Sequence, residues 1–158
     1  MTENKISTLE QLLPIVSQWK AGGEKIVFTN GCFDILHLGH IDYLEKASKK
    51  GTKLIVAINT DQSVSKIKGP NRPIQTEYAR ARMLAALAFV DAVTFFNEET
   101  PLQVIEQIMP DVLVKGNDYE IMNIVGSDIV IKNGGKVETI QLVSGYSTTN
   151  IIEKIKNK

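Results

Sequence analysis

Short apolar runs alternate with amphipathic segments along most of the chain, and this alternation limits the possible folds more than any other feature. The runs are rich in β-branched residues, as strands are, and lie at 25–30, 53–58, 90–96, 111–115 and 136–142. The segments between them place apolar residues at helical spacing, and lie at 38–50, 77–87, 101–109 and, less regularly, 120–132. Strands that alternate with helices form a parallel sheet with helices on both faces. We therefore predict an α/β fold, a doubly wound parallel sheet of about five strands.

The ends of the chain add a helix on each side of this alternation. Apolar residues recur at helical spacing from Leu9 to Trp19, and Gly22-Gly23 then stops the pattern. Ser147 and the residues after it resemble a helix N-terminus. A length of 158 residues suits one hydrophobic core. We predict a single domain, with an N-terminal helix in residues 1–23 and the α/β core in 24–158.

Charge and cysteine content limit the partners and the compartment. Lys and Arg together number 18, as do Asp and Glu, so no net field attracts nucleic acid or an anionic membrane. No apolar run approaches the roughly 20 residues that cross a bilayer. Cys32 is the single cysteine, and the chain starts without a basic and apolar leader. We expect a cytoplasmic protein that binds neither nucleic acid nor membrane.

Both histidines of the chain follow the first predicted strand. His37 and His40 are three residues apart, where a helix is expected to begin near Leu38. Their imidazoles would share one side of its first turn, beside free backbone N–H groups and the positive end of the helix dipole. Gly31 and Gly39 allow the backbone to approach a ligand closely. The pattern predicts an anion site, although two histidines that cap a helix are the structural alternative.

Other residue types around this turn are open to simpler interpretations. A zinc site would need further ligands that the spacing does not offer. Cys32 lacks an orienting third group for thiol catalysis, and is better explained as a small buried residue. The basic segment from Asp61 to Thr76 predicts a broken helix and a loop. Its cations, Lys66, Lys68 and Arg72, are either functional or simply a solvated basic face.

The motifs resemble a known family. His37-Leu-Gly-His40, after Asn30-Gly-Cys-Phe-Asp34, resembles the His-x-Gly-His signature of cytidylyltransferase-like nucleotidyltransferases, and Ser147-Thr-Thr149 resembles their second signature. Lys68-Gly-Pro-Asn-Arg-Pro73 and Val114-Lys-Gly116 with Asp118-Tyr119 are similar to the adenylyltransferases of ADP-heptose synthesis. The resemblance runs from about Lys25 to Ile155 and implies a Rossmann-like fold.

The resemblance also implies roles for particular residues. It makes His37, His40 and Lys68 catalytic, and Asn30, Asp34 and Lys68 contacts of the sugar phosphate. Asp34 has the alternatives of orienting His37, helping to hold Mg²⁺, or capping the turn. The roles of Lys66, Arg72 and Arg82 stay open. The nucleotide-binding residues implied are Thr29, Asn30, Gly31, Cys32, Phe33, His37, His40, Arg80, Lys115, Gly116, Asp118, Ser147, Thr148 and Thr149.

The implied reaction agrees with these residue types. A phosphate oxygen of a sugar 1-phosphate attacks the α-phosphorus of ATP, and pyrophosphate leaves. Because the attacking oxygen is already anionic, catalysis needs positioning and stabilisation of negative charge more than a base. Mg²⁺ is expected on the phosphates of ATP, so we predict no metal site built from protein ligands.

Several alternatives remain at this point. The donor could be CTP, with glycerol 3-phosphate as acceptor, or GTP. From other classes of protein, a non-catalytic nucleotide sensor and a zinc-binding module are possible. The small-molecule partners implied are ATP and a sugar 1-phosphate. The resemblance further implies a homodimer, and a separate sugar kinase, because this chain carries no kinase half.

Overall fold

The structure is a computed structural model that describes residues 1–157. Its elements follow the alternation predicted from the sequence, with two short 3₁₀ helices, η1 and η2, added. In chain order they are η1 (Thr2–Lys5), α1 (Leu9–Ala21), β1 (Ile26–Gly31), α2 (Leu38–Ser48), β2 (Lys53–Asn59), α3 (Asp61–Lys68), α4 (Glu77–Ala86), β3 (Ala92–Phe96), α5 (Leu102–Ile108), β4 (Val112–Gly116), η2 (Ile121–Asn123), α6 (Ser127–Lys132), β5 (Lys136–Ile140) and α7 (Thr148–Lys156).

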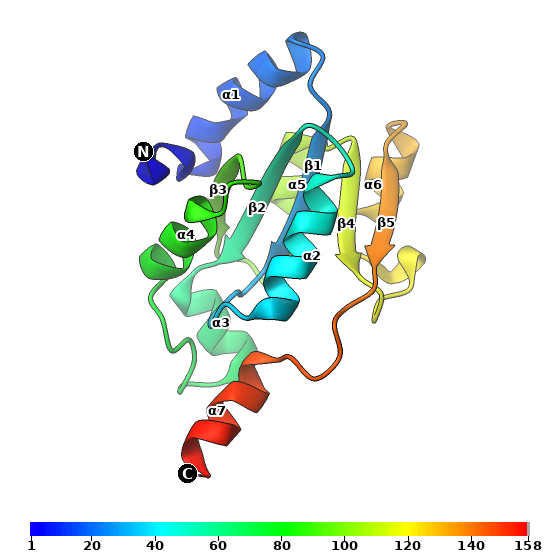
Figure 1. Cartoon of the computed structure of the whole chain (residues 1–158). Helices are drawn as coiled ribbons and strands as arrows, with labels where there is room; N and C mark the ends of the chain where they lie inside the picture. The colour runs from blue at the N-terminus through cyan, green and yellow to red at the C-terminus, as the bar shows by residue number, and fades with distance from the viewer. Residues whose placement is uncertain (158) are drawn as a thin grey trace.

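The five strands form one parallel sheet in the order β3-β2-β1-β4-β5. The chain builds β2 and β3 on one side of β1, then crosses to build β4 and β5 on the other side (Figure 1). The carboxyl ends of β1 and β4 are therefore neighbours at the point where the direction of winding reverses, which is where open α/β sheets bind ligands. The predicted fold class and strand number are confirmed.

Helices cover both faces of the sheet because successive strand residues point to opposite sides. On one face, alternate strand residues such as Val27 and Val56 pack with Leu44 of α2 and Leu84 of α4. On the other, the residues between them, such as Phe28, pack with α1, α5 and α6. Each face thus has its own apolar core, and the sheet between them is buried on both sides.

Two segments differ from the sequence prediction. The helix expected over 120–132 is divided into η2 and α6 by Gly126, which has φ of 81°. A Cβ at Gly126 would lie 2.9 Å from two side-chain atoms of Ile105, so the turn needs a glycine. The strands expected at 90–96 and 136–142 are shorter, at Ala92–Phe96 and Lys136–Ile140.

Within residues 1–157, none of the helices is both long and apolar enough to span a membrane. The opening helix α1 starts at Leu9, where Thr8 and Gln11 form a capping box, and not at the first residue.

Candidate active site

The two histidines lie together at the start of α2. His37 is the N-cap of the helix, and its Nδ1 accepts a hydrogen bond from the backbone N–H of His40 at 3.4 Å. The imidazole rings are stacked, with centroids 3.7 Å apart. The sequence-based expectation that both rings share one side of the first turn is therefore met, and the structural alternative of a capping histidine is true of His37 as well.

The cap determines which ring nitrogen of His37 is free. A neutral imidazole has one donor and one acceptor nitrogen. Since Nδ1 accepts from His40, the proton of neutral His37 is on Nε2, which is left to donate to a ligand. Burial lowers the pKa of His37, so the neutral form dominates at pH 7.

His40 is more buried than His37. Burial and, to a lesser degree, the neighbouring His37 lower its pKa to about 4 against a small opposing effect of the Ile35 backbone, so the ring is neutral at pH 7. Its Nδ1 is buried and has no hydrogen-bond partner among the described residues. A buried polar atom without a partner is costly, and a ligand oxygen that accepts from this ring would remove that cost.

Close packing fixes the pair from two sides. A Cβ at Gly39 would lie 3.1 Å from atoms of the His37 ring and 3.3 Å from Cβ of Tyr146, so any larger residue would have to push one of these side chains aside. Phe33 contacts His40 edge to face, with the ring centroids 5.1 Å apart. Its φ of 48° lies in the left-handed region, which costs a non-glycine residue about 1 kcal/mol or more and is concentrated at functional sites.

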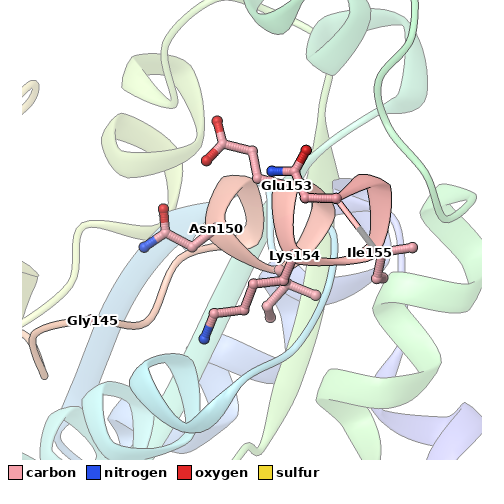
Figure 2. A pocket seen from close by; sticks show the side chains of 7 residues that line it. Gly145, Asn150, Glu153, Lys154 and Ile155 are labelled. Atoms are coloured by element: carbon pink, nitrogen blue, oxygen red, sulfur yellow. The ribbon is translucent and has the colours of Figure 1, made fainter.

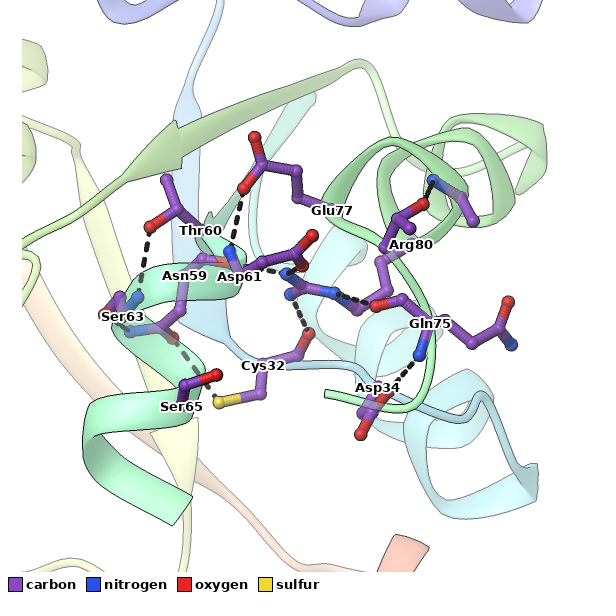
Figure 3. Close-up of polar contacts among 12 residues, drawn as sticks. Cys32, Asp34, Asn59, Thr60, Asp61, Ser63, Ser65, Gln75, Glu77 and Arg80 are labelled. Carbon is purple, nitrogen blue, oxygen red and sulfur yellow. Dashed lines mark hydrogen bonds and ion pairs between the residues drawn. The ribbon is translucent and has the colours of Figure 1, made fainter. Parts of the chain in front are cut away.

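Arg80, on α4, binds the histidine loop, which we define as residues 31–37, from inside the protein. Its side chain is fully buried, and its guanidinium donates to the carbonyls of Cys32 (2.7 Å), Asn59 (2.8 Å) and Gln75 (3.1 Å), and to the Asp61 carboxylate at 2.8 Å (Figure 3). The resemblance implies that Arg80 binds the nucleotide. The structure gives it an internal place instead, because protein oxygens already accept from all three of its nitrogens.

Asp34 also lies inside the protein, with only 1% of its surface exposed. Its carboxylate accepts from the backbone N–H groups of Ile74 and Gln75, both at 2.9 Å, and from Nε of Arg72 at 2.6 Å. Contact with the sugar phosphate, orientation of His37, binding of Mg²⁺ and capping of the turn before the helix are the roles that the sequence leaves open for Asp34. The structure corrects them, since the acceptors of Asp34 are occupied by the loop that follows Lys68.

Thr29 and Asn30 end β1 in different environments. Thr29 is fully buried, and its hydroxyl pairs with that of Tyr43 at 2.7 Å. It therefore supports the end of the strand, in contrast to the nucleotide contact that the resemblance implies. The carbonyl of Asn30 accepts from Nζ of Lys115 at 3.3 Å, across the gap between β1 and β4. Oδ1 of Asn30 is buried without a partner in the described chain.

Lys115 brings a cation to the point where the winding reverses. Burial lowers its pKa to about 8, although Asp118 and Cys32 oppose the shift. The ammonium lies 5.5 Å from the centroid of the Tyr119 ring. Gly116 follows it, and a Cβ there would lie 2.6 Å from Oδ1 of Asp118. Lys115, Gly116 and Asp118 therefore lie close together, as the sequence motif led us to expect.

The second signature lies beside the first. Ser147 caps α7 by accepting from the backbone N–H of Asn150 at 3.0 Å. The hydroxyl of Thr148 donates to the carbonyl of Ile35, in the histidine loop, at 3.4 Å. The ring of Tyr146 is 6.5 Å from that of His37. Two motifs more than a hundred residues apart in sequence thus meet at one end of the sheet; Thr149 is exposed there.

The basic segment is divided between the site and the surface. Lys68 is the last residue of α3 and is exposed, as is Lys66. Lys68 is among the charges that affect Cys32, so it lies on the side of the histidine loop. Arg82 lies elsewhere, since it pairs with Glu3 near the N-terminus and with Tyr78 on its own helix, α4.

Cys32 is half-buried, and its Sγ lies 3.6 Å from Oδ1 of Asn59. Burial raises the pKa of its thiol, and the nearby Lys68, Arg80 and Arg72 only partly oppose this. The thiol is therefore protonated at pH 7, which argues against a nucleophile.

Two further features are separate from the histidines. A shallow hollow runs along α7 and is lined by residues of its exposed side, among them Asn150, Glu153 and Ile155 (Figure 2). No lining residue is one of the predicted catalytic side chains. Among residues 1–157, no three His, Cys, Asp or Glu side chains are grouped so that they could hold a metal ion.

Sequence reasoning missed several supporting residues. Tyr43 bridges β1 and β4 by bonding Thr29 and the carbonyl of Val114, and its position three residues after His40 was the available signal. Asn59, Asp61 and Gln75 hold Arg80 or its neighbours, and nothing in their local pattern marks them. The sequence does not decide the role of Arg72, because its partner Asp34 lies 38 residues away and is brought to it only by the fold.

Comparisons with known proteins agree with this arrangement. Bifunctional protein HldE of Magnetococcus marinus is 51% identical over 152 residues, which cover 96% of this chain and 31% of that protein. The protein of the same name from Ectopseudomonas mendocina is 54% identical over 157 residues, 99% of this chain and 33% of its own length. The chain thus spans about a third of these relatives.

Solved structures extend the comparison. The lipopolysaccharide core biosynthesis protein of Thermoplasma volcanium has a TM-score of 0.61 and 30% identity, and covers 79% of this chain and 100% of its own. Pantothenate synthetase of Thermus thermophilus has a TM-score of 0.64 at 18% identity, over 96% of this chain and 69% of its own, which shows the shared fold alone. The cytidylyltransferase-like family model matches residues 28–154, from the first strand to the last helix, and this chain belongs to that family.

Proposed function

We propose that this chain transfers AMP from ATP to a heptose 1-phosphate, giving ADP-heptose and pyrophosphate. The observation that carries the proposal is the stacked pair of neutral histidines at the start of α2, which offers ring donors at the carboxyl end of the central strand. Nucleotidyl transfer needs such donors where charge grows on phosphate oxygens.

The chemistry follows from the groups present. An oxygen of the sugar phosphate bonds to the α-phosphorus of ATP as the bond to the bridging oxygen of pyrophosphate breaks. His37, through Nε2–H, donates to the phosphates, and His40 donates from its own ring. Lys68 and Lys115 add positive charge from two other segments, and the backbone N–H groups near Gly31 to Phe33 add neutral donors. No side chain becomes covalently attached.

The choice of a heptose 1-phosphate as substrate is based on sequence similarity to relatives. Lys68-Gly-Pro and Val114-Lys-Gly116 are similar to the adenylyltransferases of ADP-heptose synthesis, and relatives named HldE match nearly all of this chain at about half identity. The similarity to the lipopolysaccharide core biosynthesis protein of Thermoplasma volcanium supports a role in making surface glycan precursors.

Magnesium is proposed as an ion carried by ATP. Nitrogen and ammonium groups dominate the site and are poor partners for Mg²⁺, which prefers oxygen. The buried carboxylate, Asp34, is already occupied by Arg72 and two backbone amides. The residues therefore do not fit a protein-held metal, and the ion would reach the site on phosphate oxygens, whose charge it neutralises.

Three further expectations belong to this proposal. The enzyme would act in the cytoplasm, where its nucleotide is available. It would form a homodimer, and it would receive its sugar 1-phosphate from a separate kinase.

The test is pyrophosphate release with Mg²⁺, using ATP, CTP and GTP in turn with heptose 1-phosphate anomers and with glycerol 3-phosphate. Release with ATP and one heptose 1-phosphate anomer is the expected result. His40→Ala should release little or no pyrophosphate. Leu38→Ala, which changes an exposed residue in the same helix turn, is the control and should release pyrophosphate as the unmodified protein does.

Other outcomes would change the proposal in defined ways. Release with a different pair would keep the reaction class and replace the substrate. No release with any pair, from folded protein that binds nucleotide, would overturn catalysis in favour of a nucleotide sensor.

A further inference from the structure

A buried ion pair joins the histidine loop to the loop that follows Lys68. We define the latch loop as residues 69–76, between α3 and α4. Asp34, in the histidine loop, holds it through Nε of Arg72 and the backbone N–H groups of Ile74 and Gln75. The side chains of Arg72 and Asp34 are 15% and 1% exposed. This pair is not a surface salt bridge of the kind that contributes little.

The latch loop is also tied to the helix that ends in Lys68. Oγ of Ser65, on α3, donates to the carbonyl of Arg72 at 2.6 Å. Gly69 follows Lys68 with φ of 96°, so the chain turns sharply there. Arg72, four residues after Lys68, therefore fixes the chain that follows the helix. The side chain of Lys68 itself is exposed to solvent.

The electrostatics favour an Asp34 carboxylate that is ionised at neutral pH. Burial by itself raises the pKa of Asp34, but hydrogen bonds from Gln75, Ile74 and Arg72 more than offset this and hold the pKa below its ordinary value. Removing one partner would leave the other buried and unpaired, which is costly.

We propose that Asp34 and Arg72 are positioning residues that fix Lys68 relative to His37 and His40. Asp34 lies three residues before His37, and Arg72 lies four after Lys68, so one ion pair sets the distance between the two groups of donors. The inference rests on the proposed function, in which Lys68 stabilises charge on the reacting phosphates. It assigns to Asp34 and Arg72 no contact with substrate.

The role predicts a particular pattern of kinetic effects. Displacing a catalytic cation by about 1 Å costs up to a hundredfold in rate. Arg72→Ala should lower kcat by about ten- to a hundredfold, while KM for ATP changes by less than about threefold. Arg72→Lys keeps a charge but loses the planar guanidinium, and should recover part of the loss.

The decisive experiment is a double-mutant cycle with Lys68. If Arg72 acts through Lys68, the variant Lys68→Ala with Arg72→Ala has the same kcat as Lys68→Ala alone. If the fold-reductions in kcat of the two single variants multiply in the double variant, the proposal is overturned, because Arg72 then contacts substrate or acts by another route. An Arg72→Ala variant with unchanged kcat would overturn it as well.

A measurement without substrate separates this inference from the proposed function. Hydrogen exchange at the amides of Ile74 and Gln75 should be slow in the unmodified protein and at least about tenfold faster in Asp34→Asn. Thermal unfolding verifies that each variant is folded, and Arg82→Ala, on the exposed face of α4, is the control.

The two failures give different results. If the unmodified protein releases no pyrophosphate while Asp34→Asn still loosens the latch loop, the proposed function has failed and the ion pair stands only as a structural contact. If turnover occurs but Asp34→Asn leaves exchange unchanged, the positioning role has failed by itself.

Discussion

The histidine loop, residues 31–37, and the C-terminal segment, residues 141–157, flank the same site but are held in opposite ways. The histidine loop is fixed by buried groups, since Arg80 binds its Cys32 carbonyl and Asp34 binds the latch loop. In the C-terminal segment no residue of α7 is buried, and the helix projects away from the sheet (Figure 1). Its bond to the histidine loop is that of Thr148 with Ile35.

The difference separates two tasks in the proposed reaction. Donors that stabilise a transition state work best when they are already in place, because no reorganisation is needed during the reaction. The histidine side meets that condition. The side with Ser147 and Thr148 has few buried contacts and is the one able to adjust around a ligand.

The sharpest way to break this comparison is Arg80→Met. Loss of the guanidinium leaves buried carbonyls of Cys32 and Asn59 without their donor, and we expect a loss of at least about 3 kcal/mol in the free energy of unfolding. Chemical denaturation measures it. Arg82→Met, on the exposed side of the same helix, should leave the unfolding midpoint almost unchanged. Equal effects of the two changes would mean that the buried contacts do not hold the loop.

His40→Ala tests whether the rigid side carries the chemistry. We expect kcat to fall at least about a hundredfold, with little change in nucleotide affinity, because a donor to the transition state is lost. Steady-state pyrophosphate release and nucleotide titration give the two values. An unchanged kcat would contradict the role assigned to His40.

Acidification should destabilise the folded protein through the buried His40. The pKa of His40 is about 4 in the folded protein, against about 6.5 when unfolded, so the unfolded state binds more protons between these pH values. Burial of neutral His40 therefore costs no stability above pH 6.5, and the free energy of unfolding falls as pH drops towards 4, by about 2.5 kcal/mol at pH 4.5.

The measurement is the pH dependence of unfolding for the unmodified protein and for His40→Asn. The pKa values of Asp34 and His37 are also lowered, so both groups reduce stability on acidification in both proteins, and the difference between the two curves reports on His40 and its interaction with His37. Parallel curves would show that burial of the ring has no thermodynamic effect.

Ser147→Ala should give the smallest effect, confined to the C-terminal side. Loss of an N-cap costs a helix about 1 kcal/mol. Because no residue of α7 is buried, we expect faster hydrogen exchange in residues 148–156 and almost no change in the global unfolding midpoint. Faster exchange in the histidine loop as well would show that the two sides are more strongly coupled than the comparison implies.

The fold could be predicted from the sequence because hydrophobic periodicity reports burial directly. Val27 and Phe28 face opposite cores, and an uninterrupted apolar run such as 54–58 is what a strand buried on both faces requires. The division of the 120–132 helix could not be predicted, since it depends on the contact between Gly126 and Ile105, more than twenty residues away.

The candidate site was predictable only in part. His37, His40 and Ser147 were found because their motifs are local. The internal roles of Arg80 and Asp34 were missed because a charged residue in a motif is indistinguishable, in sequence, from one that contacts a ligand. Which partner an ionisable side chain uses is decided by distant segments that fold beside it.

The pairing of β1 differs on its two sides. β1 pairs with β2 along its whole length, from Ile26 to Gly31, whereas on the β4 side only Val27 and Phe28 have register partners. Beyond Phe28 the contact is made by side chains, such as Lys115 on the Asn30 carbonyl. Beyond Phe28, the spacing of β1 and β4 therefore depends on which side chains lie between them, whereas the spacing of β1 and β2 is set by the main chain as far as Gly31.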